Sequence, residues 1–337
     1  MRFAFTDDQL AFAEAVRDLL ANECSPSAVR EAWSYGRSDG RVPGLWERLA
    51  EMGVVGMLAP EGTDGMGMSD VDLVRIVYEA GRAALPDPLA AVAAVAVPTI
   101  RDHVESSDAE LWLGRIARGE VTIGLGLRPN AAVVGAEVAA AFLLEADDGL
   151  HLVDADVVKL SHRESVDGSR RLAVVRWNPS PATLLSGGED AVRQAHDRAA
   201  VATAAELCGL ADTMLEMTVG YVAERRQFGV PIGSFQALKH HLADALLAVE
   251  FAKPLVWRAA YSLTHADPDA SLHASMAKAA ASDAARVVGA QALQCHGAIA
   301  YTVEYDLHLW LKRTWALVAQ DGDGPYHRRR IAEALAL

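Results

Sequence analysis

The stretch Tyr221-Val-Ala-Glu-Arg-Arg-Gln-Phe-Gly-Val-Pro-Ile-Gly-Ser-Phe-Gln236-Ala-Leu-Lys-His-His-Leu-Ala-Asp244 decides the fold, because it joins two long helical segments by a tight turn. Gly229 and Pro231 end the first helix, since glycine suits a left-handed terminal position and proline cannot continue the hydrogen-bond ladder. Arg225 and Arg226 stand at that helix end. Their guanidinium groups suit either of two roles: gripping a phosphate through paired hydrogen bonds, or complementing the negative end of the helix dipole.

Helical periodicity extends on both sides of this turn. We expect one helix from about residue 191 to Arg226, roughly 50 Å long at ~1.5 Å per residue, and a second from Phe235 to just before Asp267. A third helix, rich in alanine, is expected over 271–296, and a fourth over 303–319. Four long amphipathic helices joined by short loops predict a helical bundle over residues 186–337.

The rest of the chain divides into two further regions. Residues 1–118 carry helical patterns, two of them opened by the capping sequences Thr6-Asp7-Asp8-Gln9 and Ser69-Asp70-Val71-Asp72. Residues 119–185 hold short, branched, strand-like runs, with Asp147-Asp148-Gly149 as a hairpin turn between two of them. The predicted fold class is therefore mainly α with a central small β domain, in the order N-terminal helical domain, β module and C-terminal four-helix bundle.

Composition limits the classes of function. The 337-residue chain has a formal net charge of −14, which argues against a nucleic-acid binder and against binding to an anionic membrane surface. No run reaches the roughly 18 apolar residues that a membrane span requires. The three cysteines are far apart, and His240 and His241 point about 100° apart on a helix, so neither set predicts a metal site. The N-terminus turns acidic too early for a signal peptide, and we expect a cytoplasmic protein.

Three motifs together resemble the acyl-CoA dehydrogenase family. The family's usual signature is Arg-x-x-Phe-Gly-x-x-Ile-x-x-x-Gln, and residues 225–236 keep every key position. Gln294-Cys-His-Gly297-Ala-Ile-Ala-Tyr301 resembles the family's Gln-x-x-Gly-Gly-x-Gly segment, and Asp64-Gly65-Met66-Gly67-Met68-Ser69 matches its N-terminal domain. The resemblance covers the whole chain and implies the same order of helices, sheet and helices.

The resemblance implies FAD bound in a tetramer, with the cofactor lying across a subunit boundary. Arg225 would contact the FAD pyrophosphate of a neighbouring subunit, Gln227 and Phe228 would lie beside the cofactor, and Gln236 and Gln294 would lie near its adenosine half. Hydrogen bonding between helices is the alternative role for the two glutamines. The cofactor-binding positions implied are Arg225, Gln227, Phe228, Gln236, Gln294 and Gly297.

The implied reaction is α,β-dehydrogenation of an acyl-CoA thioester, with an electron-transfer acceptor as a further partner. A carboxylate removes the α proton while the β carbon gives a hydride to the flavin. Family members usually place this base as Glu in a Tyr-Glu-Gly segment before the last helix, where this chain has Asp321, one methylene shorter. The family's other base position falls near Arg198, with Asp197 as the nearest carboxylate. Asp321 is the candidate catalytic base, and an ordinary turn residue in a glycine-rich loop is the alternative.

Three departures from the family pattern leave several hypotheses open. Ala298 and Ala300 replace usual glycines, where an extra methyl would crowd a cofactor close to the backbone. Gly124-Leu-Gly-Leu-Arg-Pro129 stands where the family has an acidic flavin-side motif. The chain is then either a homotetrameric enzyme using Asp321, or the base-deficient, non-catalytic FAD-site or scaffold half of a heterotetramer with a sister acyl-CoA dehydrogenase chain in fatty acid or steroid degradation. A flavin oxygenase or oxidase on the same fold is a further alternative.

Overall fold

The N-terminal region is helical, as the sequence predicts. The computed structural model describes residues 4–33, 39–128 and 132–337. The capping boxes form as expected, with the Thr6 backbone N–H donating to Gln9 at 2.8 Å and that of Ser69 donating to Asp72 at 2.8 Å. One of these helices is irregular, because the π-helical segment η2 (Ala90–Ala96) runs directly into α5. The α-helices are α1 (Asp7–Glu23), α2 (Pro26–Ala32), α3 (Leu45–Glu51), α4 (Asp70–Arg82), α5 (Val97–His103) and α6 (Ser106–Ala117).

The central region forms two small three-stranded sheets. The first has the order β1-β3-β4 and the second β2-β6-β5. The predicted hairpin turn joins β3 to β4, whose register pairs Ala146 with Gly149. The strands are β1 (Ile123–Gly126), β2 (Ala132–Val134), β3 (Ala141–Ala146), β4 (Gly149–Asp154), β5 (Lys159–Arg163) and β6 (Leu172–Arg176).

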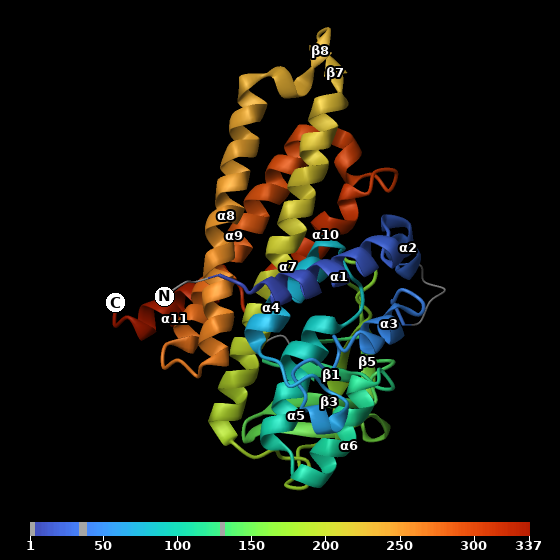
Figure 1. Ribbon diagram of the computed structural model, residues 1–337, viewed down its shortest axis with the longest axis vertical. Coiled ribbons are helices and arrows are strands. Elements are labelled where there is room, and N and C mark those ends of the chain that lie inside the picture. The colour runs from blue at the N-terminus through green and yellow to red at the C-terminus, as the bar shows by residue number, and fades with distance from the viewer. Residues whose placement is uncertain (1–3, 34–38, 129–131) are drawn as a thin grey trace.

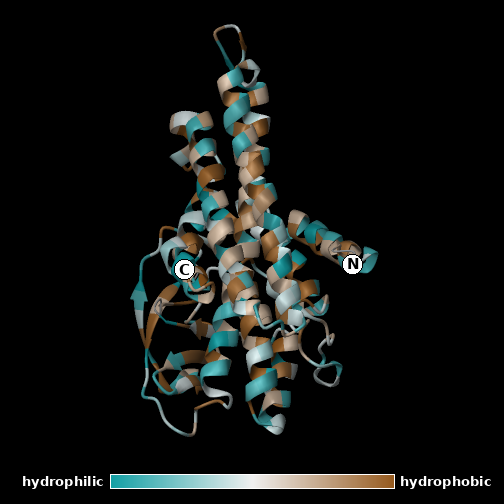
Figure 2. Cartoon of the chain, turned by 90° about the vertical axis from the view of Figure 1, so that its left-hand side faces the viewer, coloured by the Kyte–Doolittle hydropathy of each residue, from teal (hydrophilic) through white to brown (hydrophobic). Residues whose placement is uncertain are grey.

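The C-terminal region is a bundle of long helices (Figure 1). α7 contacts α8, α9 and α10, and the hairpin between α7 and α8, with the short strands β7 (Arg226–Gln227) and β8 (Val230–Pro231), projects beyond the rest of the molecule in Figures 1 and 2. Within the described residues, no helix is both long and apolar enough to cross a membrane. The helices are α7 (Gly188–Glu224), α8 (Gln236–Thr264), α9 (Ala270–His296), α10 (Leu307–Ala319) and α11 (Gly324–Ala334).

The sequence pattern does not reveal the short elements α2, α11 and β2, and each has a local cause. α2 starts at the cap Ser25 with Pro26 in its first turn, and α11 starts at the cap Asp323, whose side chain accepts from the Tyr326 backbone N–H. Ser or Asp caps followed by proline are helix-start signals that the apolar periodicity does not reveal in such short helices. The strand β2 has three residues, too few for a readable alternation. α10 begins at Leu307 rather than near 303, because residues 302–306 form turns and bends after the short helix η5 (Gly297–Tyr301).

The N-terminal region docks on the bundle through a close helix crossing. A Cβ on Gly81 of α4 would lie 2.2 Å from the Glu206 backbone oxygen, and one on Gly209 of α7 would lie 2.1 Å from the Tyr78 oxygen. Only glycine therefore lets α4 and α7 approach this closely. This crossing fixes the position of the middle of α7 relative to the N-terminal helices.

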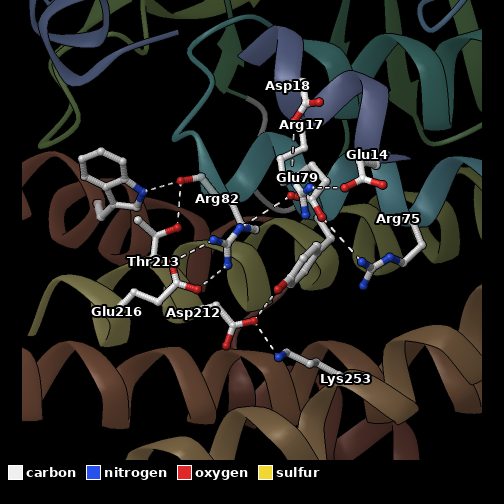
Figure 3. Close-up of polar contacts among 12 residues, drawn as sticks. Glu14, Arg17, Asp18, Arg75, Glu79, Arg82, Asp212, Thr213, Glu216 and Lys253 are labelled. Atoms are coloured by element: carbon white, nitrogen blue, oxygen red, sulfur yellow. Dashed lines mark hydrogen bonds and ion pairs between the residues drawn. The ribbon is translucent and has the colours of Figure 1, made fainter. Parts of the chain in front are cut away.

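A polar network around the same crossing adds specific contacts (Figure 3). Asp212 of α7 accepts a hydrogen bond from the Tyr78 hydroxyl and pairs with Lys253 of α8 at 2.6 Å. Arg82 of α4 forms a two-fold hydrogen-bonded pair with Glu216 of α7, at 3.0 and 2.8 Å. The network links α4, α7 and α8 into one unit. For the three regions of the chain we propose the boundaries 1–118, 119–185 and 186–337.

Candidate active site

The signature residues lie at the projecting tip of the bundle. α7 ends at Glu224, and the next residues form the tight β7–β8 hairpin, in which Phe228 and Gly229 have φ angles of 53° and 84°. The Phe228 side chain is 92% exposed, and Arg225, Gln227 and Gln236 are exposed as well. The structure therefore brings four predicted cofactor-binding residues to one surface, where they have few partners within their own chain.

The second motif lies at the same end of the bundle. His296, at the end of α9, stacks on Tyr221 of α7 with 4.3 Å between ring centroids. This contact places Gln294 and Gly297, both exposed, at the end of α7 that carries Arg225. Gly297 has a φ of 67°, and a Cβ there would meet no atom within 4 Å.

This donor set fits an FAD phosphate and adenosine group. Two adjacent exposed guanidinium groups suit a pyrophosphate, an exposed aromatic ring suits stacking, and exposed amides can both donate and accept. The Ala300 methyl, expected to crowd the cofactor, is fully buried in the chain's own core, so it faces away from any surface ligand. Of the two substitutions, Ala298 alone is exposed.

The glycines of β1 have a structural cause. A Cβ on Gly124 would lie 2.6 Å from the Phe142 ring, and one on Gly126 would lie 2.7 Å from the Leu144 side chain. Close packing inside the β region therefore requires these glycines. Arg128, which follows β1, donates its backbone N–H to Glu145 at 2.8 Å. Pro129, the last residue of the segment in place of the flavin-side motif, lies outside the described residues.

The candidate base Asp321 lies far from the signature, beside the middle of α7. Its Oδ2 accepts hydrogen bonds from the Thr203 hydroxyl at 2.6 Å and from the Gln320 amide at 3.1 Å. Asp321 has a φ of 54°, a left-handed conformation that Asp tolerates better than most residues. Asp321 is therefore a turn residue whose carboxylate is also fixed against the bundle. Asp197, the alternative carboxylate, pairs with Arg330 at 2.9 Å and accepts from Ser271.

Two buried side chains hold the Asp321 loop in place. Lys278 of α9 donates to the carbonyl oxygens of Val318 at 3.3 Å and Gly322 at 2.9 Å. Burial lowers the pKa of Lys278 to about 8. His327 of α11 contacts the Asp321 carbonyl oxygen through Nε2 at 2.9 Å, and burial lowers its pKa to about 4, which leaves the ring neutral. The loop conformation is thus fixed from both sides by the bundle.

A small cavity of about 50 Å³ adjoins this loop. Gln320 lines it, together with Glu206 of α7 and Arg170 from the β5–β6 connection. Arg170 donates to the Gln320 side-chain oxygen. Burial raises the pKa of Glu206 to about 7, although Arg313 and Arg170 oppose that shift. A deeply placed carboxyl group with a perturbed pKa at a cavity is typical of a functional site.

Sequence reasoning did not single out several of these residues. Glu206 interrupts an apolar run, Ala204-Ala205-Glu206-Leu207-Cys208, and Lys278 interrupts the alanine-rich run of α9. A lone charged residue inside an apolar stretch could have marked both as site residues, because charged groups are seldom buried without a partner or a role. Arg170 and Thr203 carried no comparable signal, since only the fold brings them together with Asp321.

The two predicted parts of the site lie far apart along α7, one beside the middle of the helix and the other at its C-terminal end. Thr203, which binds Asp321, and Arg225 are about 22 residues apart on the helix, or roughly 33 Å at ~1.5 Å per residue. The FAD-binding residues and the candidate base of one chain are therefore not neighbours.

Comparison with known proteins identifies the family. Residues 6–120 match the model of the acyl-CoA dehydrogenase N-terminal domain, and residues 187–336 match that of the C-terminal domain. The chain is 32% identical over 308 residues to acyl-CoA dehydrogenase IpdE2 of Mycobacterium tuberculosis, covering 91% of each. It is 33% identical over 345 residues to acyl-CoA dehydrogenase FadE34 of the same organism, covering 97% of this chain but 48% of that protein.

Solved structures show the same fold. The TM-score is 0.91 with a variant of the steroid ACAD Tcur3481-Tcur3483, at 24% identity and 98% coverage of both chains. It is 0.89 with the ChsE4-ChsE5 complex from Mycobacterium tuberculosis, at 21% identity, covering 100% of this chain and 99% of that one. The two domain matches and the IpdE2 relative together show that the chain belongs to the acyl-CoA dehydrogenase family, whose members are FAD-dependent oxidoreductases.

Proposed function

We propose that the chain acts in a tetramer to catalyse the FAD-dependent α,β-dehydrogenation of an acyl-CoA thioester, with Asp321 as the base. The observation that carries this proposal is the carboxylate of Asp321, fixed by Thr203 and Gln320 beside a cavity at the matching family position. Bound FAD would supply the hydride acceptor for the β carbon and the route by which electrons reach an electron-transfer acceptor. The chain's own task is to orient the thioester, exclude water and take up the α proton at the Asp321 carboxylate.

The predicted cofactor residues have a matching role in this proposal. Arg225 grips the FAD pyrophosphate, Gln227 and Phe228 flank the cofactor, and Gln236, Gln294 and Gly297 approach its adenosine half. Because Arg225 lies roughly 33 Å along α7 from Thr203, we assign these contacts to the cofactor of a neighbouring chain.

Exposed apolar side chains support assembly into an oligomer. Phe251 and Leu247 of α8 are 75% and 53% exposed, and Phe228 at the tip is 92% exposed. Apolar side chains gathered on one bundle face are costly in water and favour a protein partner. A neighbouring subunit would cover them and complete the cofactor site.

Asp321→Asn in the flavin-loaded protein tests the proposed base. Asn keeps the size and the hydrogen bonds but cannot take up a proton, so we expect flavin reduction by acyl-CoA to slow at least ~100-fold. The rate of loss of flavin absorbance in a stopped-flow instrument measures this. Asp323→Asn is the matched control, because it removes a charge from the same loop while Asn still caps α11.

A second candidate function is that of the base-deficient half of a heterotetramer. Two observations favour it: the Asp321 Oδ2 atom already accepts two hydrogen bonds, and the adjoining cavity, lined by Arg170 and Gln320, has a volume of only about 50 Å³. Two of the similar solved structures are named for pairs of chains, Tcur3481-Tcur3483 and ChsE4-ChsE5. Unchanged turnover in Asp321→Asn, with about one flavin for every two chains in a purified complex, would select this alternative.

A further inference from the structure

The cavity beside Asp321 combines apolar walls with buried charges. Pro88, Ala91 and Leu317 supply apolar surface, whereas Arg170, Arg313, Glu206 and Asp87 supply charged groups. Its volume of about 50 Å³ leaves room for a few water molecules or one small polar group, since a water needs ~10–15 Å³ of such space. An unsubstituted alkyl chain in this space would leave the charged groups without water or a partner, which is costly.

Each of the three guanidinium nitrogens of Arg313 already donates a hydrogen bond within its own chain. Its guanidinium donates to Asp167, to the Leu85 carbonyl oxygen and to the Ser169 hydroxyl at 2.6 Å. Asp167 is in turn bound by Ser169, at 3.1 Å from the backbone N–H and 2.7 Å from the hydroxyl. Arg313 is therefore held as part of the cavity wall by its own chain.

Arg170 and Glu206 differ from Arg313 in this respect. The Arg170 side chain donates to Gln320 and has further N–H groups, and Glu206 forms no side-chain hydrogen bond or ion pair with any residue that the structure describes. The two groups line one cavity without forming an ion pair with each other. An acceptor and a donor thus face the same small space.

We propose that this space receives the hydroxyl group of a hydroxylated acyl thioester, with Arg170 donating to the hydroxyl oxygen and Glu206 accepting its O–H. This inference rests on the proposed function, because Gln320 both lines the cavity and donates to Asp321 at 3.1 Å. Thr203 and Glu206 lie three residues apart on α7 and so share a face of that helix. The hydroxyl would thus bind on the same side of α7 as the group that removes the α proton.

A hydroxyl fits this pair better than other polar groups. It is both a donor and an acceptor, which matches a carboxylate and a guanidinium at once. A carbonyl would satisfy Arg170 alone, and a carboxylate would add a further negative charge beside Glu206 and Asp87.

Binding measurements on the assembled, flavin-loaded protein, with any sister chain that co-purifies, test this proposal. Matched pairs of acyl-CoAs and ω-hydroxyacyl-CoAs, from four to eight carbons long, are titrated by calorimetry, together with the dicarboxylic thioesters of the same lengths. A hydrogen bond to a charged group typically changes affinity by about 10- to 100-fold. We expect at least one hydroxyacyl thioester to bind that much more tightly than its alkyl analogue.

Substitutions then locate the preference. Glu206→Leu and Arg170→Met should each abolish it, whereas Glu206→Gln should keep part of it, because the amide oxygen still accepts a hydrogen bond. Glu216→Gln is the control on the same helix, since its side chain is 61% exposed and pairs with Arg82. If Glu206→Leu fails to fold, Glu206→Gln and Arg170→Met still carry the test.

The outcomes separate this inference from the proposed function. Equal binding of every matched pair would overturn the inference and leave the proposed function standing, and so would a preference that survives both Glu206→Leu and Arg170→Met. Tighter binding of the dicarboxylic thioesters would replace the hydroxyl site by an anion site. If no thioester binds the flavin-loaded protein, the proposed function fails and the inference fails with it.

Discussion

The tip of α7 and its inner end, by which we mean the buried stretch around Thr203 near the middle of the helix, are built in opposite ways. At the tip, Phe228 is 92% exposed, and a Cβ on Gly229 would meet no atom within 4 Å. At the inner end, Thr203 is 1% exposed and is hydrogen-bonded to Asp321. The residues of the tip therefore gain little from the fold of their own chain, whereas those of the inner end are held by it.

This contrast separates two kinds of constraint. Residues with few contacts in their own chain have identities that a bound cofactor or a neighbouring chain must explain. Residues such as Lys278, which donates to Ser282 and two carbonyl oxygens, also serve the stability of the chain. Substitutions at the inner end should change folding stability, and substitutions at the tip should change binding.

The largest effect is expected from the pH dependence of stability in Glu206→Gln. Burial raises the pKa of Glu206 to about 7 from 4.5, in the field of Arg313, Arg170, Asp321 and Asp167. Since the folded-state pKa lies above the unfolded one, the stability is complete below about pH 4.5 and is lost as the pH rises through about 7. This loss is on the order of 3 kcal/mol for the wild type.

Urea denaturation at pH 5, 6, 7 and 8 measures the effect. The Gln side chain does not titrate, so the decline in the free energy of unfolding should be shallower in the variant. Some decline should remain, because burial also raises the pKa of Asp87 to about 7. Equal slopes in the two proteins would show that Glu206 does not titrate in this range.

Arg225→Gln tests the tip of α7. Losing a charge-assisted hydrogen bond to the FAD pyrophosphate should weaken flavin binding by about 10- to 100-fold, or ~1.5–3 kcal/mol. The melting temperature of the flavin-free chain should stay the same, because Arg225 is exposed. The increase of flavin fluorescence on dilution measures the affinity of the chain for flavin. Arg163→Gln, on an exposed part of β5, is the control. A lower melting temperature in Arg225→Gln but not in Arg163→Gln would show that Arg225 also stabilises the fold, which contradicts the prediction.

Lys278→Met should lower the free energy of unfolding by about 1–2 kcal/mol at pH 7, because the Val318 and Gly322 oxygens lose their donor. Burial lowers the pKa of Lys278 to about 8 from 10.5. The unfolded state therefore holds the proton more tightly, and wild-type stability should rise between pH 8 and 10.5. The variant should lack this rise. Lys239→Met, exposed on α8, is the control, and a rise that persists in Lys278→Met would assign it to another group.

The smallest effect on stability is expected for Thr203→Val, about 0.5–1.5 kcal/mol for one lost hydrogen bond. Thr213→Val is the matched control. Thr213 also lies on α7, and its hydroxyl donates to the Arg82 carbonyl oxygen at 2.9 Å. Both substitutions should cost similar stability by thermal melting, but only Thr203→Val should slow flavin reduction by acyl-CoA, because it frees Asp321. Equal rates of flavin reduction in the two variants would show that the position of Asp321 does not affect the reaction.

Most of the fold could be predicted from the sequence because its signals are local. Capping boxes at Thr6 and Ser69, the Asp147-Asp148-Gly149 turn and the Gly229–Pro231 break each act within a few residues. The motif at 225–236 is also a continuous stretch, so it can be recognised without knowing the fold.

The inner part of the site could not be predicted in the same way. Asp321, Thr203, Gln320, Lys278 and Arg170 come from separate helices and loops, and only packing brings them together. The residue type of Thr203 or Arg170 is ordinary in its local sequence. The roles predicted for Asp321 and for the tip residues remain predictions that the variants above can test.

The continuous α7 helix also fixes a rotational phase between its two ends. One residue inserted between Thr203 and Arg225 would turn the tip by about 100° relative to the inner end. Seven inserted residues, nearly two turns, would restore the direction but lengthen the helix by ~10 Å. Length changes in related chains should therefore collect in the β region and the connecting loops, while the spacing along this helix stays constant.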